Sequence, residues 1–286
     1  MAEGKVYTQG WGPDDIPWAA FDRSKVEPWM IDVIKSAALV EYNATDYASY
    51  LKRVFPASEH AVLEQWGREE TNHGRVLGLW AELADPGFKL EEAFARFHAG
   101  YKPAHFASQD TVSVRGSRRG EMIARCVVES GTSSYYTAIK EATNEPLLKE
   151  IAGRIAADEF RHYKLFYETL QKQDEPDLPF WRKLWIAVGR ITESDDDEIA
   201  YAHYCATVSD GRVAAAPYVR GAYSRRIFAL SMRVYRRHHI QKLTQMVAKA
   251  IGAAPQGRLA KLAGALAWRT LRMLAGIAAM RSDAAA

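Results

Sequence analysis

The chain has 286 residues, of which 48% are hydrophobic and 26% charged, enough to bury one large core or two smaller ones. The two cysteines fit neither a disulfide scaffold nor a zinc site or an iron–sulfur cluster, so we expect a cytoplasmic protein. No run of about 18 apolar residues predicts a transmembrane span. The net charge of +3 is unevenly distributed, because residues 199–286 carry +12 and residues 1–198 carry −9.

Helical periodicity dominates the first part of the chain, after an irregular N-terminal arm. The predicted helices span residues 25–55, 59–84, 118–143 and 146–173. Residues 85–117 form a long connection between the second and third helices, as a crossover between parallel helices requires. We therefore predict an all-α fold in which residues 1–175 form a four-helix bundle with an N-terminal arm.

The remaining residues, 176–286, are predicted to form a basic extension of additional C-terminal helices. We expect a short helix at residues 181–190, one long or two shorter helices within 197–251, and a last helix over 257–280. The break within the middle stretch is expected at Gly211 or Pro217. In the last helix, apolar side chains line one side and four cations the other, the pattern of a basic amphipathic helix. The two sets are Leu259, Leu262, Leu266, Met273 and Ile277, and Arg258, Lys261, Arg269 and Arg272.

The most informative feature is a motif that occurs twice, in which a Glu and a His three residues apart lie on one face of a helix. A further Glu lies in apolar surroundings 29 residues before the first motif and 30 residues before the second. One such motif occurs by chance on many solvated helices, whereas the repeated pair matches the ligand set of a carboxylate-bridged dinuclear centre in a four-helix bundle. The predicted metal ligands are Glu41, Glu70, His73, Glu129, Glu159 and His162.

The charge of these residues explains why they would bind metal. Four Glu side chains inside a bundle would carry about −4 in a low-dielectric interior, which costs several kcal/mol per ion unless it is compensated. Two divalent cations neutralise this charge, and oxygen-rich ligation with one imidazole per metal suits two iron ions, or manganese with iron, better than zinc or copper. Glu70 and Glu159 are the natural bridging ligands. The terminal pairs expected from the bundle fold are Glu41 with His73 and Glu129 with His162.

Two segments, Trp66-x-x-Glu69-Glu70-x-x-His73-Gly74 and Ile155-Ala156-Ala157-Asp158-Glu159-x-Arg161-His162, resemble the soluble acyl-ACP (acyl-carrier-protein) desaturases. Those enzymes are ferritin-like di-iron proteins that use O2 and external electrons to desaturate a fatty acyl chain. The resemblance covers about residues 30–170 and implies a homodimer that acts on an unactivated C–H bond. It also implies catalytic roles for Thr132 near the O2 pocket, for Asp158 as the hydrogen-bond partner of His73, and for Trp66 close to the metals.

The connection and the C-terminal part do not match that family, so its acyl pocket and carrier-docking surface are not carried over. The basic extension predicts an acidic partner: an acyl carrier protein or acyl lipid, an electron donor such as ferredoxin, or an anionic membrane in peripheral contact with the last helix. Charge alone also suits nucleic acid, but no recognition motif supports it. The alternative functions are a di-iron hydroxylase or oxygenase of a membrane lipid, quinone or amine, and, less favoured, a ferroxidase or iron-storage protein. Thr132 and the lack of a rubredoxin-type cysteine set argue against storage.

Overall fold

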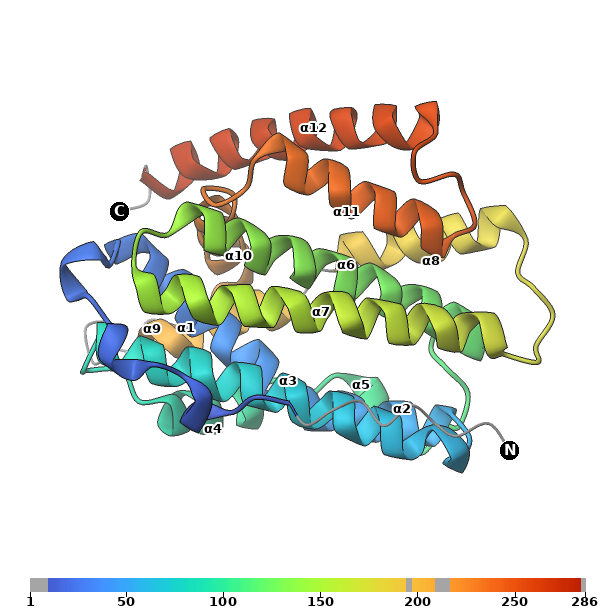
Figure 1. The fold of residues 1–286 in the computed structure, drawn as a ribbon, viewed down its shortest axis with the longest axis horizontal. Coiled ribbons are helices and arrows are strands. Elements are labelled where there is room, and N and C mark those ends of the chain that lie inside the picture. The colour runs from blue at the N-terminus through green and yellow to red at the C-terminus, as the bar shows by residue number, and fades with distance from the viewer. Residues whose placement is uncertain (1–9, 194–196, 209–216, 284–286) are drawn as a thin grey trace.

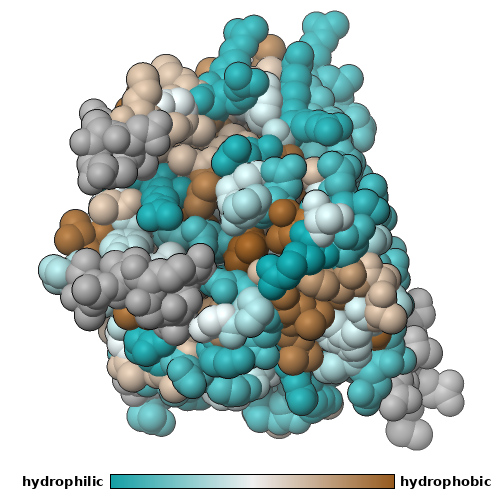
Figure 2. All heavy atoms as spheres, turned by 90° about the vertical axis from the view of Figure 1, so that its left-hand side faces the viewer, coloured by the Kyte–Doolittle hydropathy of each residue, from teal (hydrophilic) through white to brown (hydrophobic). Residues whose placement is uncertain are grey.

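The computed structural model describes residues 10–193, 197–208 and 217–283, and over these residues the protein is helical without a β-strand. The all-α prediction is therefore confirmed. Figure 1 shows the long helices running roughly along the long axis of the molecule, with α12 (Arg258–Asp283) at one edge. Figure 2 shows the end of the molecule at the left of Figure 1, where the surface is mostly hydrophilic and hydrophobic residues form small patches, as is normal for a protein surface.

The expected first helix, residues 25–55, is two helices, α1 (Pro28–Tyr42) and α2 (Ala44–Val54). Between them Asn43 has φ −82° and ψ 3°, and its backbone N–H donates to the carbonyl of Val40 three residues back. This tighter spacing interrupts the regular helix. The next helix, α3 (Ala57–Ala84), matches the expected second helix and packs against both α1 and α2.

The predicted crossover contains two short helices, α4 (Leu90–Gly100) and α5 (Ala104–Ala107). It leads into α6 (Arg118–Ala142) and α7 (Pro146–Lys172), which pack against each other as a hairpin. The start of α7 is held by the buried carboxylate of Glu145, which accepts hydrogen bonds from two backbone N–H groups of α7 and from the Trp80 indole of α3. This cap joins the α6–α7 hairpin to α3, so that α1, α3, α6 and α7 enclose one interior.

The C-terminal extension is helical, as expected. It consists of α8 (Phe180–Glu193), α9 (Asp197–Val208), α10 (Arg220–Ser231), α11 (Arg237–Ala250) and α12. Of the two expected breaks, Gly211 lies outside the described residues, and Pro217 is not helical. A further interruption at residues 232–236, between α10 and α11, was not expected from the sequence.

The extension packs on the first part of the chain through two hydrophobic cores. Cys205 of α9 belongs to a core with residues of α1, α3 and α7, and Met246 of α11 belongs to a second core with residues of α2, α3 and α6. The division of the chain into domains 1–175 and 176–286 stays a prediction. Among the described helices, none combines the length and the apolar content needed to cross a bilayer.

Candidate metal centre

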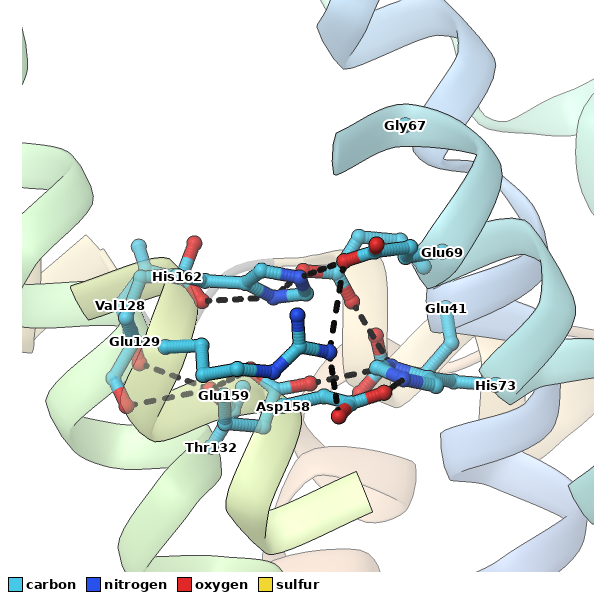
Figure 3. Close-up of polar contacts among 12 residues, drawn as sticks. Glu41, Gly67, Glu69, His73, Val128, Glu129, Thr132, Asp158, Glu159 and His162 are labelled. Atoms are coloured by element: carbon cyan, nitrogen blue, oxygen red, sulfur yellow. Dashed lines mark hydrogen bonds and ion pairs between the residues drawn. The ribbon is translucent and has the colours of Figure 1, made fainter. Parts of the chain in front are cut away.

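Four helices bring the six predicted ligands into one buried interior (Figure 3). Each of α3 and α7 supplies the Glu and the His of one motif from a single helical face, while α1 and α6 each supply one Glu. Five of the six side chains are buried and Glu41 is partly buried. The contributions are Glu41 from α1, Glu70 and His73 from α3, Glu129 from α6, and Glu159 and His162 from α7.

The close approach of α1 and α3 depends on Gly74, which directly follows His73. A Cβ atom at Gly74 would lie 2.3 Å from the backbone N of Tyr42 and 2.8 Å from the carbonyl oxygen of Ala38. Any side chain at this position would push the two helices apart. The glycine therefore lets Glu41, next to Tyr42, reach the same interior as His73.

The six side chains form two groups whose possible ligand atoms lie within 4.8 Å of one another, and these groups share two carboxylates. In the first group, Nδ1 of His73 lies 3.3 Å from Oε2 of Glu70 and 3.2 Å from Oε1 of Glu159. In the second, Nδ1 of His162 lies 3.0 Å from Oε1 of Glu70 and 3.8 Å from Oε2 of Glu129. The groups are Glu41, Glu70, His73 and Glu159, and Glu70, Glu129, Glu159 and His162.

In the metal-free protein, the pKa values of several of these buried side chains are shifted far from their ordinary values. Burial, followed by repulsion from Glu70 and Glu159, raises the pKa of Glu41 and the pKa of Glu129 well above the usual carboxyl value. Burial opposes the charged forms of Glu70 and His162 too, but their mutual attraction outweighs it. The pKa of Glu70 is therefore well below its usual range, and that of His162 is raised to about 9. Protons thus balance the carboxylates in the metal-free protein.

Several atoms in the two groups are suited to metal ligation. Oε2 of Glu129, Oε1 of Glu159 and Nδ1 of His162 are buried and make no hydrogen bond. A buried polar atom without a hydrogen-bond partner is costly, and a cation held by the second group would satisfy all three. With mostly oxygen donors and one imidazole in each group, the residues fit iron or manganese. The buried Glu and His groups could therefore hold metal ions, although the assignment of each ligand stays a prediction.

Each histidine is oriented by a carboxylate that lies outside the two groups and contacts the Nε2 atom of its ring. Nε2 of His73 lies 3.1 Å from Oδ2 of Asp158, and Nε2 of His162 lies 2.7 Å from Oε2 of Glu69. These contacts favour the tautomer with the proton on Nε2, which leaves Nδ1 of both rings free toward the shared interior. Arg161 contacts the carboxylates of both Glu69 and Asp158.

The sequence indicated the role of Asp158 but not the equivalent role of Glu69. The pattern was nevertheless present, because an acidic residue directly precedes the Glu of each motif, as Glu69-Glu70 and as Asp158-Glu159. Trp11 in the N-terminal arm was also missed. Its indole N–H donates to Oδ2 of Asp158 at 2.8 Å, and its ring stacks on His73 at 5.7 Å. A Trp in the irregular arm before the first helix carries no periodic signal that would show which residue it contacts.

Three further residues lie beside the groups. The Thr132 hydroxyl donates to Oε2 of Glu159 at 2.5 Å, and the Tyr136 hydroxyl donates to Oε1 of Glu41 at 2.6 Å. Trp66 is buried and packs edge-on against Phe166. A small pocket between α3 and α7 is lined by Val62, Gln65, Trp66, Glu69, Arg161, His162 and Leu165.

We expect Asp158→Asn and Glu69→Gln each to weaken metal binding by about 10- to 100-fold, because neither amide can hold its histidine in the ligating tautomer as a carboxylate does. Competition titration of the purified proteins with a metal chelator measures this change. Glu150→Gln, an exposed change on α7, is the control. Unchanged metal affinity in both variants would contradict the orienting role.

Fold and site together define an all-helical protein with two adjoining, buried carboxylate–histidine groups that could hold metal ions. No protein-family model matches the chain, and no curated protein matches it.

Proposed function

We propose that this protein is a di-iron, O2-activating oxidoreductase with a ferritin-like bundle, acting on an unactivated C–H bond of a fatty acyl substrate as the acyl-ACP desaturases do. The observation that supports this most directly is the sharing of Glu70 and Glu159 between two groups that each contain one His. That arrangement suits two cations bridged by carboxylates. When bound, iron would supply the O2 chemistry, with electrons from an external donor.

The chain's own residues would bind the metal ions, orient the ligands and shield the site from water. Asp158 and Glu69 orient the two imidazoles, and Thr132 places a hydroxyl against Glu159 at the edge of the site. The burial of the ligands keeps water away from the reacting atoms.

The proposed partners follow from the charge of the extension. Residues 199–286 carry +12, which favours an acyl carrier protein that delivers the substrate and an acidic electron donor of the ferredoxin type. A homodimer is proposed from the resemblance of the two motif segments alone.

The test is single-turnover reaction of iron-loaded protein with an acyl thioester of the carrier protein, O2 and a reductant, analysed by mass spectrometry. Loss of two hydrogen atoms from the acyl chain supports desaturation. Gain of an oxygen atom would instead assign the protein as a hydroxylase. Rapid consumption of free Fe(II) without any change in the acyl chain would assign a ferroxidase.

Within this assay, Thr132→Val is expected to retain iron but to lower product formation by about 10- to 100-fold, because it removes the hydroxyl that contacts Glu159. Thr137→Val is the matched control. Its hydroxyl lies five residues further along α6 and donates to the backbone carbonyl of Ser133. Iron content is measured on the same samples, and equal activity of the two variants would remove Thr132 from the mechanism.

A further inference from the structure

The helix α12 faces the solvent with its large apolar residues. Leu259 is 83% exposed, Leu262 and Leu266 are each 67% exposed, and Met273 and Met280 are exposed to a similar degree. The side of α12 that packs against α10 and α11 is instead built from small residues such as Ala260, Gly264 and Ala278. We call the five large residues the outer stripe.

This orientation is the reverse of that in an ordinary surface helix, which buries its large apolar side chains. Small residues let α12 lie close to α11: a Cβ atom added at Gly264 would lie 3.4 Å from the Cα of Gln241. The outer stripe repeats at intervals of three, four and seven residues, so it forms one continuous row along the helix. A contiguous exposed apolar row of this length marks an interaction surface.

The charges around the outer stripe indicate what covers it. Between Arg258 and Arg281, α12 contains cations but neither Asp nor Glu. Helical periodicity places Arg258 and Arg269 along one border of the stripe. A second copy of α12 would bring like charges together, which is unfavourable, whereas an anionic surface pairs with every cation.

We infer that α12 docks this protein on the surface of an anionic lipid bilayer, with the outer stripe in the acyl boundary and the cations against the lipid phosphates. A continuous row of Leu and Met that is bordered by Arg, on a helix without an acidic residue from Arg258 to Arg281, is the pattern of a helix that lies in the interface of an anionic bilayer. The helix lies on the membrane, since no described helix is long and apolar enough to cross it. This inference is independent of the metal centre.

Co-sedimentation with vesicles tests the inference. We expect the full-length protein to bind vesicles of phosphatidylcholine mixed with phosphatidylglycerol more tightly than vesicles of phosphatidylcholine alone. Leu262→Glu/Leu266→Glu should lower the partition coefficient for the anionic vesicles by at least about tenfold. In the wild type, both leucine side chains move from water into the lipid on binding, and the charged replacements would not. The matched control is Val112→Glu/Val114→Glu, which places the same two charges on exposed apolar positions of the crossover and should bind as the wild type does.

Arg269→Glu/Arg272→Glu separates the two contributions, since it should abolish the preference for phosphatidylglycerol while leaving the outer stripe intact. Circular dichroism melting checks that all variants fold. Absence of wild-type binding to anionic vesicles, or equal loss in the control, overturns the inference. So does a wild-type dimer in light scattering that Leu262→Glu/Leu266→Glu splits into monomers, because the outer stripe would then be a subunit interface. Iron content and turnover serve as separate readouts, so failure here leaves the proposed function standing.

Discussion

Glu159→Gln is expected to yield purified protein with less than about one tenth of the wild-type iron, because it changes a metal ligand itself rather than a residue that orients a ligand. Glu159 belongs to both groups, so its loss removes a ligand from each cation at once. Glu70→Gln should have the same effect for the same reason. Elemental analysis of protein purified from iron-supplemented cells measures the change.

Two further variants make this result specific. Glu41→Gln alters one group only and should retain more iron than Glu159→Gln does. Glu150→Gln, on the exposed side of α7, should retain the wild-type amount. If Glu159→Gln kept its full iron content, or if wild-type protein contained no metal, the shared-carboxylate centre would be wrong.

The second large effect concerns the thermal stability of the metal-free protein, which should fall as the pH rises from about 6.5 to about 9. The pKa of His162 is about 9 in the folded protein and near its ordinary 6.5 in the unfolded chain. Below pH 6.5 both states carry the proton, so the full stabilisation is present; above it the folded state alone holds the proton, and the stabilisation is lost as the pH approaches 9. The raised pKa values of Glu41 and Glu129 act in the same direction above pH 4.5.

Bound metal should reverse this dependence, because cations replace the protons that the groups hold. At a metal concentration about 1,000 times the Kd, each site adds about 4 kcal/mol to the free energy of unfolding, which corresponds to about 10 °C in Tm. Calorimetry with a chelator and with added Fe(II) under anaerobic conditions, at pH 6.5 and pH 9, measures both effects. This account would be contradicted if the Tm of the metal-free protein rose with pH, or if added metal left the Tm unchanged.

The helical class and the position of the motifs could be predicted because both depend on local periodicity. A Glu and a His three residues apart share a helix face whatever the helix packs against, so Glu70–His73 and Glu159–His162 were recognisable as units. The interruption at Asn43 escaped prediction because its neighbours continue the helical pattern on both sides. Its cause is a single altered backbone conformation.

The orienting role of Glu69 shows a different limit. Glu69 and Glu70 are neighbours in α3, yet Glu70 faces the shared interior with His73 while Glu69 contacts Nε2 of His162 on α7. Nothing within α3 indicates which His an acidic residue will meet, because that depends on how α3 and α7 cross. Likewise, amphipathicity predicted an apolar and a cationic face for α12, but it did not show that both face the solvent and that a third side of small residues packs on α11.

The sequence by itself therefore determined that this protein is helical, that two of its helices each carry a carboxylate and an imidazole on one face, and that its last helix separates apolar residues from cations. The tertiary structure decided that Glu41 joins the group of His73, that Glu129 joins that of His162, and that the outer stripe of α12 meets solvent. The physical reason is the range of the interactions. Helical periodicity is set by neighbours within a few residues, whereas the assembly of a site and the burial of a face depend on contacts between helices far apart in the chain.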